Sequence, residues 1–240
     1  MGELKDRRAR KKAQTRELIR SVAQRMIDER GFERVTIADI AGECDVAVQT
    51  VFNHFATKEE LFFDGRTPWV ESLAESVRTR EPGTPPLSAL RAHLVDTIAQ
   101  LLTSFSCADR RRYLATLEAS AALRAFEREL LHTTELKLQQ ALLEAWADGV
   151  SVAPLEPEVS APVIAAIWVA AGRSLLVAQR PSISSGADPR QTAEAARAMA
   201  DRVLRQLELG ANAVHGPVAG TATPEPPADT GWPQAVLRAG

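Results

Sequence analysis

The chain has 240 residues, of which 25% are charged and 45% are hydrophobic, and its net charge is −2 at pH 7. These values are ordinary for a soluble globular protein with one or two domains and a sizeable core. The slightly negative net charge excludes attraction of the chain as a whole to nucleic acid, so any basic surface must be local.

The first 25 residues carry such a local charge, because nine lysines and arginines stand there against three acidic residues. A basic arm of this kind suits contact with phosphates or a minor groove, and it is also the composition of a solvated terminus. Residues 1–17 lack an apolar segment, so we expect no signal sequence. Apolar spacing predicts a helix over residues 11–30, which Gly31 ends.

Three short helices with their own capping signals are predicted between Phe32 and Phe63. Thr36 and Asp39 form the first signal, a carboxylate version of the capping box. The apolar residues around them share one helix face: Ile37, Ile40, Ala41 and Cys44. Asp45 tolerates left-handed backbone, which a sharp turn between two helices often needs.

The second of these helices is predicted over residues 48–53, and a third begins after Thr57, with Glu60 completing a T-x-x-E capping box. Two short helices joined by a tight turn make a helix-turn-helix. Residues of the second helix region available for packing are Val51, Phe52 and Phe55. The outward positions are Val48, Gln49, Thr50 and Asn53. Amide side chains bond bidentately to adenine and threonine contacts base edges, so this face suits the DNA major groove. A helical hairpin with no DNA role has the same spacing.

This stretch resembles the DNA-binding domain of the TetR family of bacterial transcriptional regulators. The resemblance covers residues 16–61 and rests on Gly31, Phe32, Thr36, Ile37, Ile40, Ala41, Val46, Thr50, His54, Phe55, Lys58 and Leu61. The chain departs from the family at the turn, where Cys44-Asp45-Val46-Ala47 replaces the usual Ala-Gly-Val-Ser and removes the serine cap. Gln49 replaces a frequent Gly, and Phe52 replaces a frequent Tyr.

The side-chain chemistry and the resemblance together predict the DNA contacts of this site. Gln49 and Thr50 are expected to read bases, with Val48 and Asn53 on the same face. The residues expected to hold phosphates are Thr36, His54 and Lys58. Thr36 and Lys58 also lie at helix starts, where free N–H groups favour a phosphate. Phe52 lacks the hydroxyl that a Tyr would donate to a phosphate, so we expect it to pack.

The remainder of the chain is predicted to be helical. A helix from Thr57 is broken or bent near Gly65 to Pro68 and reaches about residue 80, and a linker follows it over residues 81–86. Further helices are expected over residues 87–105, 109–119, 121–147, 158–180 and 189–209. The triplet Arg110-Arg111-Arg112 is interpreted as solvated surface. The apolar run in residues 158–180 is short and Arg173 interrupts it, so no membrane span is expected.

We therefore predict an all-α protein with a DNA-binding domain over residues 1–56 and a helical ligand-binding and dimerisation domain over residues 57–209. Residues 210–240 are predicted to be a disordered tail. The helix over 158–180 is apolar on more than one face, so it is expected to pair, with the 189–209 helix, in a four-helix bundle between two copies. The candidate interface residues are Ile164, Ile167, Ala170, Ala196, Met199 and Val203.

A ligand cavity is predicted between the helices of residues 87–180, with apolar and aromatic walls that suit a largely apolar or aromatic effector. Its candidate residues are Trp69, His93, Phe105, Tyr113, Trp146 and Trp168. Each aromatic residue in this set is more often plain core than a ligand contact. His93 lies on a polar stripe of its helix, and such a stripe is either a solvated face or part of a cavity.

No Gly-rich phosphate loop, CxxC or HExxH motif occurs in the sequence, so we expect no enzyme, no metal site and no cofactor. The two cysteines, Cys44 and Cys107, are expected to be free thiols in a reducing cytoplasm. By the resemblance, the predicted function is a repressor that binds a palindromic operator on double-stranded DNA as a homodimer and is released by a small molecule. An activator or a ligand-independent regulator shares these features. An all-α ligand-binding protein or enzyme is the remaining alternative.

Overall fold

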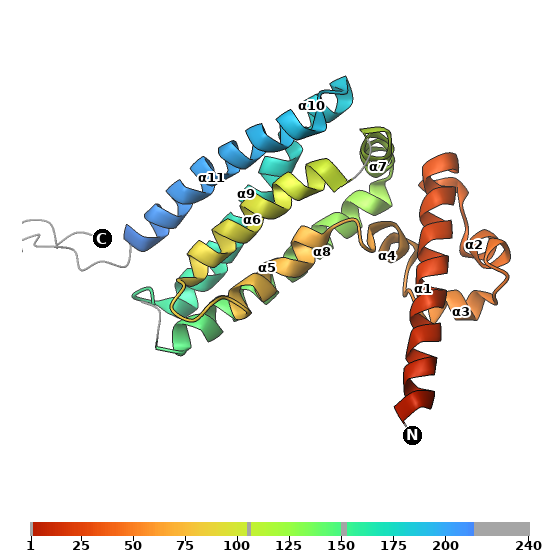
Figure 1. The fold of residues 1–240 in the computed structure, drawn as a ribbon, viewed down its shortest axis with the longest axis horizontal. Helices are drawn as coiled ribbons and strands as arrows, with labels where there is room; N and C mark the ends of the chain where they lie inside the picture. Colours follow the sequence, from red (N-terminus) through yellow and green to blue (C-terminus); the bar gives the residue numbers. More distant parts are fainter. Residues whose placement is uncertain (1, 105–106, 150–152, 214–240) are drawn as a thin grey trace, which may run out of the picture.

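The structure is a computed structural model that describes residues 2–104, 107–149 and 153–213 (Figure 1). Throughout these ranges the regular structure is helical. The elements are α1 (Gly2–Arg30), the 3₁₀ turn η1 (Phe32–Arg34), α2 (Ile37–Glu43), α3 (Val48–Phe52), α4 (Lys58–Phe63), α5 (Pro68–Arg78), α6 (Pro86–Ser104), α7 (Cys107–Ala119), α8 (Ala121–Ala147), α9 (Pro157–Val177), α10 (Arg180–Ser185) and α11 (Pro189–Ala213). The predicted all-α class is confirmed.

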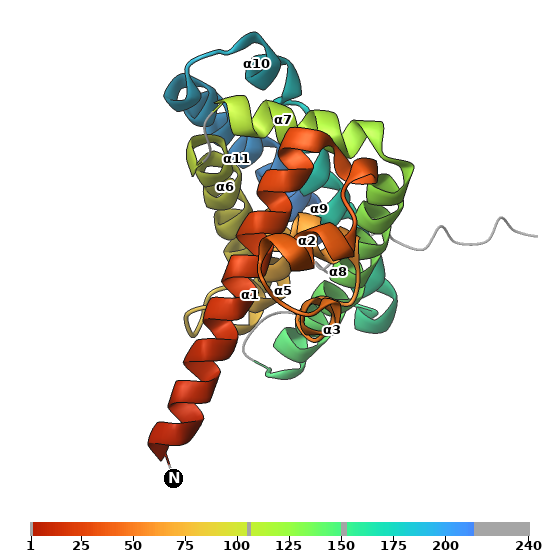
Figure 2. The same cartoon turned by 90° about the vertical axis from the view of Figure 1, so that its right-hand side faces the viewer.

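The helices form two lobes, which Figures 1 and 2 show from two sides. The small lobe consists of α1, α2 and α3, and the N-terminal half of α1 projects from it as a rod (Figure 2). The large lobe is a body of long helices, in which α5 packs on α6 and α8, α8 packs on α9, and α6 packs on α11. α4 lies between the two lobes, beside α1 (Figure 1).

The small lobe has a core of its own. Ile19, Ala23 and Ile27 project from α1 at helical spacing and are fully buried, and Ile40 and Val51 meet them from α2 and α3. α1 is nine residues longer at its start than the predicted helix over 11–30. The reason is local, because the residues before 11 include Leu, Lys, Arg, Ala and Glu, which are strong helix formers.

α4 is shared between the lobes through stacked aromatic rings. Phe62 stacks on Tyr113 of α7, with ring centroids 5.1 Å apart and planes 7° from parallel. Phe63 stacks on Phe126 of α8 at 5.4 Å. Leu61 is fully buried with these residues in the core of the small lobe. The core of the small lobe therefore continues through α4, beyond the expected boundary at residue 56.

The predicted break near Gly65 separates two helices. α4 ends at Phe63 and α5 begins at Pro68, a favoured residue for the first turn of a helix. Gly65 has a φ of 69°, which is left-handed backbone that a residue with a Cβ adopts only at a cost. This four-residue joint connects the small lobe to the body.

The later helices follow the predicted order with two differences. Residues 180–185, expected in a helix end and a loop, form the short helix α10, which Gly186 closes in the left-handed conformation. α11 continues to Ala213, so residues 210–213 are helical rather than part of a tail. The rest of the predicted tail, residues 214–240, lies outside the described residues.

α9 is a core helix of the body. The segment Pro157–Ile183 is long and apolar enough to cross a membrane by length and composition alone. Ala161, Ala165, Trp168 and Val169 of this helix are nevertheless buried inside the body. α9 packs against α8, α6 and α11. Burial among other helices thus explains part of the apolar composition of α9.

Candidate nucleic-acid interface and internal cavity

The turn between α2 and α3 has the geometry of a helix-turn-helix. Thr36 and Asp39 form the predicted capping box, in which Thr36 Oγ1 accepts from the Asp39 N–H and the Asp39 carboxylate accepts from the Thr36 N–H at 2.9 Å. Hydrogen bonding to Thr36 lowers the pKa of Asp39, which keeps the cap ionised. Asp45 has a φ of 53°, the left-handed backbone that the sequence predicted at this turn.

α3 turns one face inward and one face outward. Val51 is fully buried, and Phe55 just beyond the helix is 1% exposed. The outward side chains are Val48, Gln49, Phe52 and Asn53, while Thr50 is half-buried. The expectation that Phe52 packs is wrong, because this ring is 46% exposed. Neighbouring residues on a helix point about 100° apart, so the inward position of Val51 leaves Phe52 on the rim of the outward face.

The outward face of α3 carries its own hydrogen bond. Gln49 Nε2 donates to Asn53 Oδ1 at 3.3 Å, one turn along the helix. Ala47 precedes the helix without a side-chain cap, as the missing serine predicted. The two amide side chains are therefore ordered by each other and not by contacts with the protein core.

Arg16 fixes the end of α3 to α1. Its guanidinium lies 4.0 Å from the centre of the Phe55 ring, donates to the main-chain carbonyl of His54, and pairs with Asp64 at 2.6 Å. Burial together with the positive charges of Lys12 and Arg16 lowers the pKa of His54 below its ordinary value of 6.5. The neutral form of His54 is therefore favoured at pH 7 in the protein without DNA.

Gln24 of α1 is buried and caps the last turn of α4. Its Nε2 donates to the carbonyls of Leu61, Phe62 and Asp64 at 3.1, 3.4 and 2.8 Å. Carbonyls at the end of a helix lack partners within the helix, so this amide satisfies groups that would otherwise be costly to bury. α1 and α4 are thereby joined by polar bonds as well as by packing.

Lys58, at the first turn of α4, does not point freely outward. Its ammonium donates to the carbonyls of Phe32 and Val35 at 2.9 and 3.0 Å and lies 4.1 Å from the centre of the Phe32 ring. These bonds use two of its three donors. Lys58 therefore ties α4 to the segment between α1 and α2, a role that sequence reasoning missed.

One of the two hydrogen bonds at the start of α4 differs from the predicted capping box. Thr57 Oγ1 accepts from the Glu60 N–H at 3.1 Å, as a T-x-x-E signal requires. The Glu60 carboxylate, however, accepts from the N–H of Ala56 at 2.7 Å and not from that of Thr57. Thr57 and Glu60 thus both stabilise the start of α4, but the Glu60 carboxylate binds the N–H one residue before the one that the capping box predicts.

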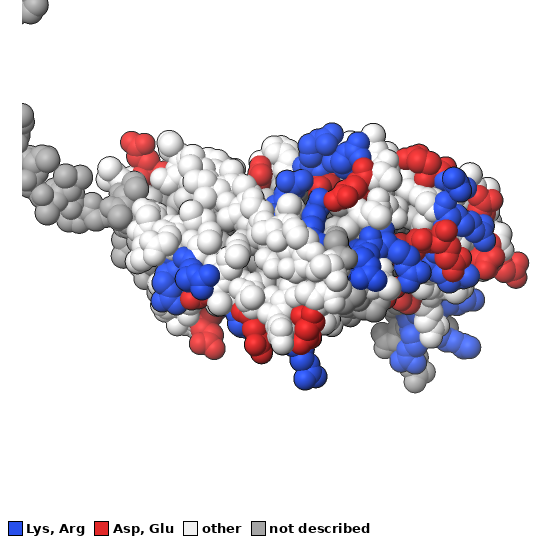
Figure 3. All heavy atoms as spheres, turned by 90° about the horizontal axis from the view of Figure 1, so that it is seen from above, with Lys and Arg blue, Asp and Glu red and all other residues white. Residues whose placement is uncertain are grey.

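Charged side chains of both signs crowd the end of the molecule that the small lobe forms, whereas the body shows a broad uncharged surface in the same view (Figure 3). The basic residues of the projecting part of α1 are exposed: Arg7, Arg8, Arg10, Lys11 and Lys12. This arm therefore supplies a local positive charge, although the net charge of the whole chain is slightly negative.

A cavity of about 170 Å³ lies between the body and the small lobe. Its apolar walls come from α6, α7, α8 and α9, and they include Leu101, Leu114, Leu130 and Leu176. Asp28 of α1 and Arg66 and Thr67 of the joint complete it. The cavity thus reaches further toward the small lobe than the predicted site between the helices of residues 87–180.

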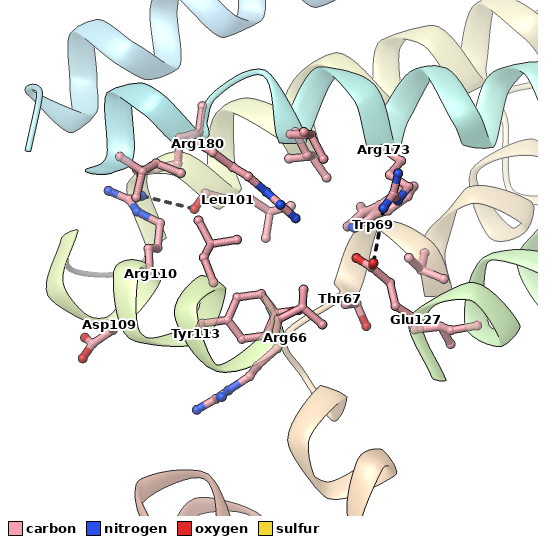
Figure 4. A pocket seen from close by; sticks show the side chains of 18 of the residues that line it. Arg66, Thr67, Trp69, Leu101, Asp109, Arg110, Tyr113, Glu127, Arg173 and Arg180 are labelled. Carbon is pink, nitrogen blue, oxygen red and sulfur yellow. Dashed lines mark hydrogen bonds and ion pairs between the residues drawn. The ribbon is translucent and has the colours of Figure 1, made fainter. Parts of the chain in front are cut away.

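Two of the six predicted cavity residues, Trp69 and Tyr113, line this cavity (Figure 4). Trp146 and Trp168 are not among its lining residues, and they pack in the core of the body. His93 does not line it either, and its Nε2 lies 2.6 Å from Ser72 Oγ, between α6 and α5. Phe105 lies outside the described residues.

The cavity has charged lining residues that the sequence did not reveal. Arg66 binds Asp28 through two hydrogen bonds of 2.7 and 3.1 Å, and both side chains are more than four-fifths buried. Arg110 is buried, although its triplet was interpreted as solvated surface. The sequence contains a sign of this burial, because Arg110, Leu114 and Leu117 recur at helical spacing and share the inward face of α7.

The candidate dimer residues divide into two groups. Ile164 and Ala196 are buried within the protomer's own core. Ile167, Ala170, Met199 and Val203 are exposed, together with Val159 and Val163 of α9. α9 and α11 are in contact with each other, so these exposed side chains belong to adjoining helices.

Residues 19–64 match the family model described as "Bacterial regulatory proteins, tetR family". None of the curated proteins matches the sequence. Among solved structures, a putative TetR-family transcriptional regulator from Mesorhizobium loti has a TM-score of 0.50 and 17% identity, over 83% of this chain and 97% of its own. This likeness supports the two-lobed fold.

Two further solved structures align over most of this chain with lower TM-scores. NalD, the secondary repressor of the MexAB-OprM multidrug efflux pump in Pseudomonas aeruginosa, has a TM-score of 0.47 and 22% identity, over 79% of this chain and 95% of its own. FadR from Bacillus subtilis, in complex with stearoyl-CoA, has a TM-score of 0.43 and 16% identity, over 77% and 96%.

Proposed function

Through residues 19–64 this chain belongs to the tetR family of bacterial regulatory proteins, and on that premise we propose that it is a cytoplasmic repressor that binds a palindromic operator as a homodimer until a small ligand releases it. The observation that carries this proposal is the outward face of α3. Gln49, Phe52 and Asn53 are exposed there, while Val51 and Phe55 anchor the helix in the core. Two exposed amide side chains on a short helix that is anchored in the core suit entry into a major groove.

The DNA contacts divide into base reading and phosphate contact. Gln49, Thr50 and Asn53 can bond to base edges, and Val48 can touch a thymine methyl group. Thr36 at the exposed start of α2 and the basic arm of α1 are placed for phosphates and the minor groove. Phe52, on the rim of the same face, offers an apolar contact to the sugar-phosphate backbone.

The homodimer is proposed from the apolar side chains exposed on α9 and α11. Val163 and Ile167 are 54% and 44% exposed, and Met199 and Val203 are 40% and 42% exposed. An exposed apolar surface of this kind marks an interaction site. Two-fold pairing of α9 and α11 would present both α3 helices to one side, which is why the operator is expected to be palindromic.

Ligand release is proposed from the position of the cavity. Because Asp28 of α1 and Arg66 of the joint line it, a ligand there contacts residues of the small lobe directly. A ligand that binds more tightly when the small lobe is displaced shifts the population away from the DNA-binding conformation. Through Asp28 and Arg66, a bound ligand would therefore affect the position of the DNA-binding lobe.

The test is fluorescence anisotropy with duplexes that tile the DNA flanking the gene for this protein, compared with random duplexes. We expect at least one tile to bind about a thousandfold more tightly than random DNA at the same salt concentration. Sedimentation of that complex should show an even number of protomers. Equal affinity for every tile and for random DNA would contradict sequence-specific regulation.

A further inference from the structure

The outward side chains of α3 lie in two rows that run along the helix. Residues four positions apart lie on the same side of a helix, one above the other. Val48 and Phe52 form an apolar row, and they are 41% and 46% exposed. Gln49 and Asn53 form an amide row, and both are exposed. Each amide follows an apolar residue by one position, so the two rows run side by side.

The buried side of α3 determines where the two rows lie. Val51 is fully buried and anchors the helix in the core. At about 100° per residue, Gln49 and Asn53 each point about 160° away from Val51, so the amide row lies opposite the core. The apolar row lies on one flank of the amide row. In Figure 1, α1 lies between α3 and the body, so the body does not cover either row.

The amide row retains free hydrogen-bonding groups. Gln49 Nε2 donates to Asn53 Oδ1 at 3.3 Å, which leaves Gln49 its carbonyl oxygen and one N–H. Asn53 keeps both of its N–H groups and one lone pair of its oxygen. Adenine offers an acceptor, N7, and a donor, N6, in the major groove, and an amide side chain bonds to both. Each amide of this row can therefore bind one adenine while the bond between the two amides persists.

The apolar row has no hydrogen-bonding group in its side chains. Among the groups on the major-groove edge of a base pair, the methyl group of thymine is the one that suits such a surface. Removing this methyl group and an exposed apolar side chain from water together is favourable. An A·T pair presents adenine N7 and N6 on one half of its edge and the thymine methyl on the other half. Two adjoining rows, one of amides and one apolar, match these two halves.

We propose that α3 reads two A·T pairs in each half-site, with the adenines bonded to Gln49 and Asn53 and the thymine methyl groups against Val48 and Phe52. The inference rests on the proposed function and names the base pairs that its operator contains. Residues four apart are about 6 Å apart along a helix, and stacked bases are about 3.4 Å apart. The two A·T pairs are therefore adjacent or separated by one pair.

The position of the methyl group agrees with the place of Phe52 on the rim. The methyl group lies at the thymine end of the edge, next to the sugar-phosphate backbone. A ring on the rim of α3 can therefore touch the methyl group and the neighbouring sugar together. A G·C pair presents no methyl group, so the apolar row would lie against polar groups and lose this contact.

The first experiment selects duplexes from a random library with the full chain. We expect the enriched palindrome to contain two A·T pairs within three neighbouring positions of each half-site. An enriched palindrome without such pairs would overturn this inference and leave the sequence-specific regulator standing. No enrichment over the starting library would contradict the proposed function, and the inference with it.

The second experiment changes single atoms of the selected duplex and measures affinity by fluorescence anisotropy. Uracil in place of either thymine removes only the methyl group and should weaken binding about three- to tenfold. Replacing either adenine by 7-deazaadenine removes the N7 acceptor and should weaken binding about tenfold. Uracil at thymines outside the half-sites is the control and should have no effect. Unchanged affinity with either analogue in the half-sites would overturn the proposal.

Three variants assign the rows to the bases. Val48→Ala should abolish the effect of uracil at one thymine, and Phe52→Ala should abolish it at the other. Gln49→Ala should abolish the effect of 7-deazaadenine at one adenine and keep both uracil effects. All three side chains are exposed, so the variants are expected to fold. Leu136→Ala is the matched control, because Leu136 is exposed on α8. Full uracil effects at both thymines in Val48→Ala and in Phe52→Ala would overturn the apolar row as a methyl reader.

Discussion

Gln49 donates to Asn53 across one turn of α3, with Nε2 and Oδ1 3.3 Å apart, and both side chains face outward. The bond holds the two amides side by side in the free protein. Each can then offer donors and acceptors to a base edge without first being ordered by DNA, which lowers the entropic cost of recognition.

The first prediction concerns this pair. Gln49→Ala should lose roughly 1–3 kcal/mol of binding free energy on the true operator and almost none on random DNA, because a lost base contact affects only the matching sequence. Anisotropy titrations with both duplexes measure the difference. If Gln49→Ala weakened both duplexes by the same factor, Gln49 would not be a base reader.

The second prediction concerns Lys58, whose ammonium donates to the carbonyls of Phe32 and Val35. Lys58→Met should lower the free energy of unfolding by about 1–3 kcal/mol, because partly buried carbonyls lose their charged donor. Urea denaturation measures this loss. The salt dependence of operator binding distinguishes the two roles of this lysine: a slope lower by about one unit, with stability unchanged, would favour the phosphate contact predicted from the sequence.

The third prediction concerns the exposed apolar surface of α9 and α11. Ile167→Glu and Val203→Glu should each give monomers that bind the operator weakly, because a charge in the centre of an apolar interface is costly. Leu136→Glu is the control, since Leu136 is 54% exposed on α8 and outside the proposed interface. Sedimentation velocity measures the oligomeric state, and a dimeric Ile167→Glu would argue against this interface.

The fourth prediction concerns pH and His54, whose pKa in the folded protein lies below 6.5 because of burial and nearby positive charges. When the pH falls through 6.5, the unfolded chain takes up a proton that the folded protein resists, so the free energy of unfolding decreases. The decrease stops once the pH is below the folded-state pKa.

His54→Gln removes this proton uptake, so its stability relative to the native chain should improve as the pH falls below 6.5. Urea denaturation at pH values on both sides of 6.5 measures the trend. His132→Gln, at an exposed position, is the control. A difference between His54→Gln and the native chain that does not vary with pH would be inconsistent with a lowered pKa.

The fifth prediction compares two glycines. Gly65→Ala should destabilise the fold by about 1–3 kcal/mol, because φ is 69° there and an added Cβ would lie 2.8 Å from the Arg20 guanidinium. Gly42→Ala should stabilise it by about 0.5–1 kcal/mol, because Gly42 is helical and an added Cβ meets no atom within 4 Å. Thermal denaturation of both variants checks the opposite signs.

The helix-turn-helix could be predicted from the sequence because its signals are local. The Thr36–Asp39 cap and the left-handed Asp45 each depend on residues within one turn, and the structure shows both. The charge of the cavity could not be predicted in this way. The inward direction of Arg110 depends on how α7 packs against α6 and α10, and the Arg66–Asp28 pair joins residues 38 positions apart.

The contacts of single residues could not be predicted where a distant partner decides them. Lys58 resembles a phosphate contact by its place at a helix start, but the carbonyls that it binds lie 26 and 23 residues earlier in the chain. The missing hydroxyl of Phe52 predicts packing, but Phe52 follows the buried Val51 by one position and so points about 100° away from the core.

The joint between Phe63 and Pro68 connects α4 to the first helix of the body. On one side, Gln24 and Arg16 bind Asp64 and hold the end of α4 to α1. On the other side, α5 is embedded in the body. Two of the four residues of the joint, Arg66 and Thr67, are walls of the cavity. A molecule in the cavity would therefore touch the covalent connection between the two lobes without an intervening helix.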